Sequence, residues 1–321
     1  MRICLMVEGQ EGVSWQDWVS LAEACERAGL EGLFCSDHYL PTISSQAGGG
    51  LDAWATLSAL AARPHRIRLG TLVSPVTFRH PAVLAKMAAT VDHVSGGRVE
   101  VGLGAGWFEA EHRSFGFPFP EVGERMAMLG EQLEIVSRML AADEDDRVSF
   151  QGRYYRLDGC PVAPRPIQRP RPPIIVGGSG GRRSAFLAAR YADEYNTFLA
   201  TLEEVRERRA RVVEACERAG RDPGTLAFSL MTACVVGSDR HELLGRVREL
   251  LRVLGAEGED AEAVLRDRSD QWLAGTPSAV AERLSALAEA GVERVYLQHL
   301  LHRDLDMVAL VGVEVGPKVA P

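Results

Sequence analysis

The sequence predicts a single (β/α)8 TIM barrel over residues 1–321. Short β-rich runs alternate with amphipathic helical stretches, and eight such strand–helix units fit into the 321 residues. The strand segments are nearly continuous apolar runs, as expected of parallel strands that are buried on both faces. The alternative is a doubly wound open sheet, which needs a GxGxxG fingerprint after its first strand. The segment EGQEG at residues 8–12 does not match that fingerprint.

Capping residues support the order of the elements. Ser14 can cap the first helix, Gly29 can end it, and Asp52 can cap the second helix. The predicted strands span residues 2–7, 32–35, 67–73, 98–103, 173–176, 193–198, 226–236 and 294–299. The predicted helices span residues 14–29, 52–63, 81–94, 123–140, 181–191 and 202–219, and helical sequence also follows residue 236.

Two segments depart from this alternation. Residues 142–172 begin with the acidic ADEDD and end in the proline-rich PVAPRPIQRPRPP, which fits neither a helix nor a central strand. We expect an extended excursion there. Residues 256–276 are polar and acidic, and we expect a surface insertion before a last helix capped at Thr276 or Ser278.

Composition excludes several classes of protein. The net charge of −8 argues against a nucleic-acid-binding protein and against a membrane-surface protein. No apolar run is long enough to span a bilayer, and the apolar stretch before Glu8 is too short for a signal peptide. Six scattered cysteines suggest a reducing compartment, so we expect a soluble cytoplasmic protein. Only Lys86 and Lys318 are lysines among 36 basic residues, which suggests a GC-rich, actinobacterial source.

The segment GGRVEVGLGAGW at residues 96–107 places Gly102, Gly104 and Gly106 at alternate positions before Trp107. Glycine at every second position of a strand leaves one face without side chains. Two interpretations are open at this point. The bare face can accept a large flat ring, or it can relieve crowding at a tight corner of the barrel.

Polar residues gather at the carboxyl ends of the predicted strands, where barrels carry their active sites. His38 is the best candidate for proton transfer, because histidine titrates near neutral pH. The alternative is that Asp37 caps a turn and His38 packs at the rim. The glycine-rich segment VGGSGGRR at residues 176–183 opens a helix and suits a phosphate group, although a flexible turn is the alternative. No metal-binding motif is present, and no lysine lies at a strand end.

Four segments resemble the bacterial luciferase-like family, and its F420-dependent oxidoreductase branch in particular. They are SDH at 36–38, LGTLVSPVTFRHPAVLAKMAATVDHVSGGRVEVGLGAGW at 69–107, EHRSFGFPFP at 111–120 and PRPIQRPRPPIIVGGSGGR at 164–182. The resemblance implies a barrel with an insertion near its seventh strand. It also implies that FMN or the deazaflavin F420 binds across the carboxyl ends of the strands.

The resemblance also implies roles for individual residues. His38 is the expected acid or base, and a non-proline cis peptide is expected within residues 72–74, behind the ring. The expected cofactor-binding residues are Asp37, Leu72, Val73, Ser74, Ala105, Gly106, Gly177, Gly178 and Ser179. Trp107 and Glu109 are expected in the substrate pocket. Trp107 stands where the sugar-phosphate dehydrogenase branch has glutamate, which argues against a sugar-phosphate substrate. Several aromatic residues suggest instead a hydrophobic or aromatic substrate: Trp54, Trp107, Phe108, Phe115 and Phe117.

We therefore expect an F420-dependent oxidoreductase that transfers a hydride between the deazaflavin and a small organic substrate. The acidic tail of F420 could pair with Arg79, Arg182 or Arg183. The first alternative is an FMN-dependent monooxygenase of the same family, and the second is a non-catalytic flavin-binding protein. The resemblance further implies a homodimer formed through the second and third helices.

Overall fold

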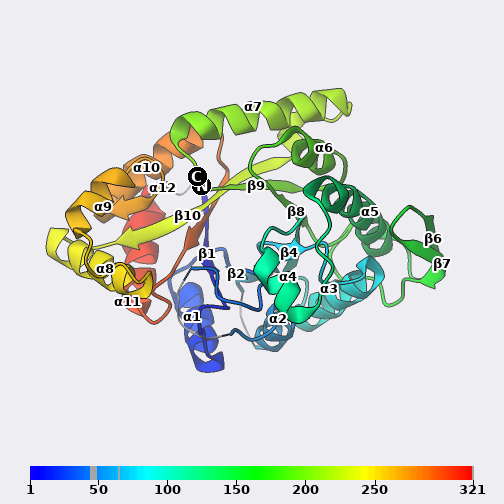
Figure 1. The fold of residues 1–321 in the computed structure, drawn as a ribbon, viewed down its shortest axis with the longest axis horizontal. Coiled ribbons are helices and arrows are strands. Elements are labelled where there is room, and N and C mark those ends of the chain that lie inside the picture. The colour runs from blue at the N-terminus through cyan, green and yellow to red at the C-terminus, as the bar shows by residue number, and fades with distance from the viewer. Residues whose placement is uncertain (44–48, 64–65, 320–321) are drawn as a thin grey trace.

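Eight parallel strands close into a barrel in the computed structural model, and helices surround it (Figure 1). The structure describes residues 1–43, 49–63 and 66–319, so residues 44–48, 64–65 and 320–321 of the predicted domain lie outside the described residues. Around the ring the strands follow the order β1, β2, β3, β5, β8, β9, β10 and β12. The predicted (β/α)8 class is confirmed, and the open-sheet alternative is excluded by this closure.

Pairing between the first and last strands closes the ring. Leu5 of β1 lies beside Leu297 of β12 on one side and beside Leu33 of β2 on the other. The strands of the ring are β1 (Arg2–Val7), β2 (Gly32–Cys35), β3 (Arg68–Thr71), β5 (Val99–Gly104), β8 (Ile174–Gly177), β9 (Glu194–Phe198), β10 (Ala227–Val236) and β12 (Arg294–Gln298). Almost every residue of these strands is buried, which explains their continuous apolar runs.

The helices begin largely where the capping residues predict. Ser14 and Asp17 form a capping box at α1, and Asp52 caps α2 through the backbone of Ala55. The helices of the first half are α1 (Trp15–Arg27), α2 (Ala53–Ala61), α3 (Pro81–Ser95), α4 (Glu109–Phe115) and α5 (Val122–Ala141). Those of the second half are α6 (Arg182–Tyr191), α7 (Leu202–Arg218), α8 (Arg240–Val253), α9 (Ala261–Asp267), α10 (Pro277–Glu289), α11 (Leu305–Leu310) and α12 (Gly316–Val319). The sequence did not predict the short helix α4.

The third strand ends earlier than predicted. It stops at Thr71, the Leu72–Val73 peptide bond is cis, and the chain then pairs with β5 again as β4 (Ser74–Pro75). A non-proline cis peptide therefore lies within residues 72–74, as the family resemblance led us to expect. The Val73 side chain lies against Gly104 of β5 and Gly177 of β8.

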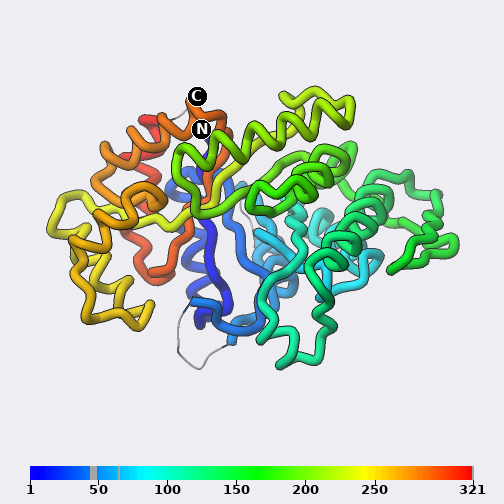
Figure 2. The backbone as a smooth tube through the Cα atoms, turned by 45° about the horizontal axis from the view of Figure 1, so that its top comes forward, coloured from blue at the N-terminus to red at the C-terminus, as the bar shows by residue number. Residues whose placement is uncertain are grey.

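Both segments that depart from the alternation carry regular structure. Within residues 142–172, β6 (Arg147–Gln151) and β7 (Arg156–Pro161) form an antiparallel hairpin that projects from the barrel in both ribbon and tube views (Figures 1 and 2). Glu131 of α5 anchors its turn by accepting hydrogen bonds from the backbone of Arg153, Tyr154 and Tyr155. Within residues 256–276, α9 is followed by β11 (Leu273–Gly275), which pairs with the end of β10. Thr276 then precedes α10.

A buried ionic cluster fills the amino-terminal end of the barrel interior. Arg294 of β12 donates hydrogen bonds to Glu100 of β5 at 2.7 Å and to Glu194 of β9 at 3.2 Å. Tyr296 also donates to Glu194, at 2.7 Å, and the Arg294 guanidinium lies 4.9 Å from the centre of the Phe34 ring. Charges at this depth are tolerated because each has partners of the opposite sign. This network connects β5, β9 and β12 at the amino-terminal end of the barrel.

The two ends of the described chain meet at the surface, where the amino group of Met1 donates to the carbonyl of Val319 at 2.6 Å (Figure 2). Among the described residues, no helix is both long and apolar enough to cross a membrane.

Candidate functional site

His38 and Glu111 form a hydrogen-bonded pair at the carboxyl-terminal end of the barrel. His38 follows β2, Glu111 belongs to α4, and Nδ1 of His38 donates to Oε2 of Glu111 at 2.9 Å. The other carboxylate oxygen of Glu111 accepts hydrogen bonds from the backbone N–H groups of Tyr39 and Leu40. Glu111 is completely buried. The pair therefore fixes the histidine ring and occupies Nδ1, which leaves Nε2 for proton exchange with a substrate.

Electrostatics favour the charged form of this pair. Burial lowers the pKa of His38, but the hydrogen bond to Glu111 and its charge outweigh burial, so the pKa of His38 is raised. Burial raises the pKa of Glu111, yet His38 and the backbone donors of Tyr39 and Leu40 outweigh it, and the pKa of Glu111 is lowered. The geometry thus keeps a larger fraction of His38 protonated near neutral pH than in a free histidine.

Helix α4 delivers Glu111 because the chain turns sharply after β5. Gly106 has φ +77°, a conformation that glycine adopts without a steric penalty. His112, the next residue along α4, then fixes the helix. Its Nε2 lies 2.6 Å from the Thr77 hydroxyl, and its Nδ1 lies 2.7 Å from the carbonyl oxygen of Phe108. The sequence placed Glu109 in the site, whereas Glu111 is the residue that reaches His38.

Asp37 lies in a buried network beside this pair. Its Oδ2 accepts hydrogen bonds from the Ser74 hydroxyl and from the Arg79 guanidinium, both at 2.5 Å. The Trp54 indole donates to the same Ser74 hydroxyl at 3.0 Å. Burial raises the pKa of Asp37, and the charge of Arg79 opposes this only in part. Among the described residues Oδ1 of Asp37 has no hydrogen-bond partner, so one carboxylate oxygen stays unsatisfied.

Arg79 is committed to this network. Besides Asp37 it donates to Asp52 at 2.8 Å and to the Tyr39 hydroxyl at 3.2 Å, and its side chain is 10% exposed. Its positive charge is therefore balanced within the protein. Of the three arginines that could pair with an acidic cofactor tail, only Arg182 and Arg183 therefore stay candidates, because Arg79 is already paired.

The alternating glycines of β5 make room for the neighbouring strand. A Cβ atom on Gly102 would lie 1.9 Å from the carbonyl oxygen of Thr71, and one on Gly104 would lie 2.6 Å from a methyl group of Val73. A Cβ on Gly177 of β8 would lie 3.0 Å from the same methyl group. The interpretation that these glycines themselves form the floor of a ring pocket is therefore wrong at Gly102 and Gly104. Crowding by residues 71–73 explains them, and the partly exposed Val73 covers their bare face.

The glycine-rich segment after β8 leads directly into α6. The N–H groups of Gly178 and Gly180 donate to the Asn196 carbonyl and the Tyr195 hydroxyl, each at 2.9 Å, so both are used within the protein. In the described part of the chain no side chain caps α6 at Gly181. The first N–H groups of α6, with exposed Ser179 and Arg182 beside them, suit an anion. The N–H groups that suit an anion thus belong to the first turn of α6, slightly later in the chain than Gly177 and Gly178.

Trp107 and Glu109 both face solvent. Trp107 is 62% exposed and lies edge-on to the His38 ring, with ring centroids 5.7 Å apart. Glu109 is exposed at the start of α4. Trp107 is therefore beside the proton-transfer candidate, whereas no contact joins Glu109 to His38. Ala105 lies between Gly104 and Gly106, partly exposed at the end of β5.

Three further polar residues line the same end of the barrel interior. Glu8 follows β1 and accepts hydrogen bonds from the amide of Gln10 at 2.9 Å and from that of Gln298 at 2.6 Å. The carbonyl oxygen of the Gln10 side chain accepts from the Ser36 hydroxyl. These hydrogen bonds connect the carboxyl-terminal ends of β1, β2 and β12. Glu8 directly follows β1, and Gln298 is the last residue of β12.

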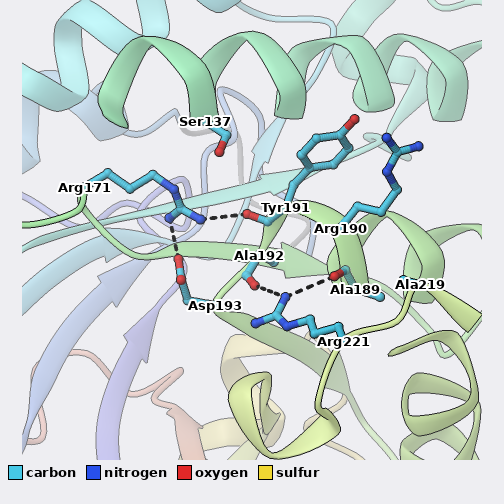
Figure 3. Close-up of a pocket in the computed structure, with 9 residues that line it drawn as sticks. All are labelled: Ser137, Arg171, Ala189, Arg190, Tyr191, Ala192, Asp193, Ala219 and Arg221. Carbon is cyan, nitrogen blue, oxygen red and sulfur yellow. Dashed lines mark hydrogen bonds and ion pairs between the residues drawn. The ribbon is translucent and has the colours of Figure 1, made fainter. Parts of the chain in front are cut away.

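A surface cavity of about 520 Å³ lies away from this site, near the amino-terminal ends of β8 and β9 (Figure 3). Its arginines stabilise the fold. Arg221 donates to the carbonyls of Ala188, Ala189 and Ala192 at the end of α6, and Arg171 pairs with Asp193. Because these guanidinium groups already have acceptors, the cavity is a structural junction between α6 and α7.

The closed parallel barrel defines the (β/α)8 class, and the histidine–carboxylate pair lies at the carboxyl ends of its strands, where enzymes of this fold carry their active sites. The family model of luciferase-like monooxygenases matches residues 2–294, and the chain belongs to that family. It is an oxidoreductase of the luciferase-like type.

Relatives of known activity fall into two groups by cofactor. An FMNH2-dependent dimethylsulfone monooxygenase of Pseudomonas putida is 30% identical over 88% of this chain and 82% of that protein. An F420-dependent glucose-6-phosphate dehydrogenase of Amycolatopsis mediterranei is 36% identical over 56% of this chain, and an F420-dependent hydroxymycolic acid dehydrogenase of Mycobacterium tuberculosis is 32% identical over 69%. The chain spans only 52% and 59% of the length of these two dehydrogenases.

A solved structure supports the fold assignment. An F420-dependent secondary alcohol dehydrogenase, solved with an F420–acetone adduct, superposes with a TM-score of 0.82 at 22% identity, covering 100% of this chain and 99% of that one. At this identity the likeness shows the barrel alone. The two cofactor groups among the relatives leave F420 and FMN both open.

Proposed function

We propose that the protein is an F420-dependent oxidoreductase in which His38 exchanges a proton with the substrate. The observation that carries the proposal is the 2.9 Å contact between His38 and the buried Glu111 at the carboxyl ends of the strands. When bound, F420 supplies hydride donation or acceptance at its deazaflavin ring. Glu111 holds the imidazole, and Nε2 of His38 gives a proton to the reduced substrate or takes one from the substrate being oxidised.

The residues around the pair fit a flat ring that carries a phosphate. Val73, partly exposed after the cis bond, offers apolar contact to the ring, with Leu72, Ala105 and Gly106 near it. The start of α6 offers backbone donors to a phosphate, together with Ser179. Asp37 does not contact the ring. It is a positioning residue, which holds Ser74 by accepting a hydrogen bond from its hydroxyl. Glu109 lies at the outer edge, where it could meet only the distal part of a substrate.

Two exposed arginines favour F420 over FMN. Arg182 and Arg183 begin α6 and extend the positive end of that helix. FMN ends in a single phosphate, whereas the acidic tail of F420 continues beyond its phosphate and can use both guanidinium groups. This argument no longer includes Arg79, whose charge Asp37 and Asp52 balance.

The second candidate is an FMN-dependent monooxygenase. The observation that favours it is the similarity to the FMNH2-dependent dimethylsulfone monooxygenase of Pseudomonas putida, which aligns with 88% of this chain. The third candidate, a non-catalytic flavin-binding protein, gives no reason for the buried carboxylate that holds His38. Oxygen consumption in the presence of reduced cofactor separates the first two activities.

Equilibrium binding of F420 and FMN to the cofactor-free protein tests the proposal. We expect F420 to bind more tightly. The double variant Arg182→Gln/Arg183→Gln weakens F420 more than FMN, and Arg190→Gln at the opposite end of α6 serves as the matched control. His38→Ala keeps cofactor affinity and loses turnover. Tight FMN binding with no measurable F420 binding would falsify the choice of cofactor, and unchanged turnover in His38→Ala would remove His38 from the reaction.

We also propose that the protein is a cytoplasmic homodimer that acts on a small molecule and binds neither nucleic acid nor membranes. The free cysteines and the net charge of −8 support this proposal. Sedimentation of the purified protein measures the oligomeric state directly.

A further inference from the structure

Two aromatic side chains stand against the proton-transfer candidate. The Trp107 ring meets the His38 ring edge-on at 5.7 Å, and the Phe108 ring meets it at 6.2 Å. Trp107 and Phe108 stack on each other, with centroids 5.2 Å apart and an angle of 27° between their planes. His38 is therefore bordered on this side by two aromatic rings.

The backbone around this aromatic pair is held in place. The carbonyl of Phe108 lies 2.7 Å from Nδ1 of His112, and Nε2 of His112 is bound in turn to Thr77. Gly106 sets the turn just before Trp107. Anchoring of this kind lowers the entropy lost when a ligand binds, because the backbone that carries the rings is already ordered.

Trp107 nevertheless presents most of its surface to solvent, at 62% exposure. A large apolar ring left exposed beside a functional group is typical of a binding surface rather than of a core. Packing within the chain does not explain it, since Phe108 covers only one face of the indole. The exposed indole surface is therefore available to another flat molecule.

Three carboxylates act on His38, and one of them, Glu8, accepts hydrogen bonds from the neutral amides of Gln10 and Gln298. Glu111 is paired with His38 itself, and Asp37 is paired with Arg79. Arg79 also binds Asp52. A substrate that approaches His38 past Trp107 therefore meets aromatic surface and one proton-exchanging nitrogen, with no cation of this network left to hold a phosphate.

We infer that Trp107 selects the substrate class: the substrate carries a flat, uncharged aromatic or conjugated group that packs on the indole, next to a carbonyl or hydroxyl that reaches His38. This inference rests on the proposed function and narrows it. Neutral aromatic or conjugated ketones, and the alcohols derived from them, fit the surface. Phosphorylated sugars fit less well, because they offer no flat conjugated face to the indole and because Arg79, the cation of this network, is already paired with Asp37 and Asp52.

Binding measured by ligand-observed NMR, on cofactor-free and F420-loaded protein, tests the inference without turnover. The probes are 2-acetonaphthone, its ring-saturated counterpart 2-acetyldecalin, and glucose 6-phosphate. We expect 2-acetonaphthone to bind best. In Trp107→Ala it should lose about tenfold in affinity, the equivalent of one good aromatic contact with its buried surface. Trp107→Phe should retain most of the affinity.

Trp15→Ala is the matched control, because Trp15 is also exposed, at 37%, and belongs to α1. Equal losses in the Trp15 and Trp107 variants, equal affinity for the saturated ketone, or tighter binding of glucose 6-phosphate would each overturn the inference. The result is separable from the proposed function. If F420 fails to bind while 2-acetonaphthone still depends on Trp107, the cofactor proposal is wrong and the substrate surface stands.

Discussion

Nδ1 of His38 lies 2.9 Å from Oε2 of Glu111, although 73 positions separate the two residues in the chain. The contact joins the loop after β2 to the helix after β5, two elements of the same barrel mouth. It converts an isolated histidine into an oriented one with a raised pKa. Its removal therefore has consequences that a simple structural contact would not have.

Glu111→Gln keeps the size of the side chain and removes its charge. Burial of His38 then dominates, and the pKa of His38 falls. In the direction of substrate reduction the protonated ring is the acid, so activity is present at low pH and lost as pH rises through that pKa. We expect the alkaline limb of the pH profile of kcat/KM to move to lower pH, and an NMR titration of His38 to show the same displacement. Glu109→Gln on the same helix is the control. An alkaline limb at the same pH in wild type and Glu111→Gln would show that Glu111 does not raise the pKa of His38.

Gly104→Ala should destabilise the fold by about 1–3 kcal/mol, because the new methyl group meets a methyl of Val73 at 2.6 Å. Val73→Ala removes that obstacle, so the double variant should recover most of the loss in urea unfolding. Gly102→Ala offers the comparison. There the obstacle is the Thr71 backbone carbonyl at 1.9 Å, which no side-chain change removes. Additive losses in the Gly104–Val73 double-mutant cycle would contradict this account.

His299 makes the fold sensitive to acid. It is buried, and among the described residues neither of its ring nitrogens has a hydrogen-bond partner. Burial lowers its pKa from 6.5 to about 4, so the stability tied to the neutral ring is complete above pH 6.5 and is lost as pH falls through about 4. From pH 7 to pH 5 this one group removes about 2 kcal/mol of unfolding free energy.

His299→Phe should flatten that dependence when urea unfolding is compared at pH 7 and pH 5. His241→Gln, at an exposed histidine of α8, should leave it unchanged. The same acid loss in wild type and His299→Phe would assign the sensitivity to other groups.

Arg294→Met should cost about 3–5 kcal/mol of unfolding free energy, because it leaves the buried Glu100 and Glu194 without their main cation. Arg2→Met is the matched control. Arg2 lies beside Arg294 in the strand register and also contacts Glu194, but its side chain is 44% exposed, so its loss should cost less than about 1 kcal/mol. Equal costs in urea unfolding would show that burial does not decide the strength of these ion pairs.

Local pattern was enough to predict the barrel. Apolar runs mark strands that are buried on both faces, and Ser14 and Asp52 mark helix starts through hydrogen bonds that span three residues. For seven of the eight strands of the ring, the predicted boundaries were within one residue of the structure. The exception is the third strand, whose end depends on a cis bond and on pairing with β5.

The candidate site was less accessible to sequence reasoning, because its contacts are not local. The His38–Glu111 contact depends on α4, a seven-residue helix with no side-chain cap at its start. The available signal was that Glu109 and Glu111 both follow β5, and only the helical turn decides which of them is buried. The sequence alone left two interpretations of Gly102 and Gly104 open, room for a ring or relief of crowding, and contact with Thr71 and Val73 favours crowding. The roles assigned to the remaining site residues stay predictions.

The ionic cluster of Arg294, Glu100 and Glu194 also limits where ligands can bind to the barrel. It fills the amino-terminal end of the barrel with buried, paired charges, which leaves the carboxyl-terminal end as the face where ligands can bind. A cofactor and a substrate would then both bind from the carboxyl-terminal end of the barrel. If one of the two lies beneath the other, it must bind first and leave last, so binding at this end is then ordered.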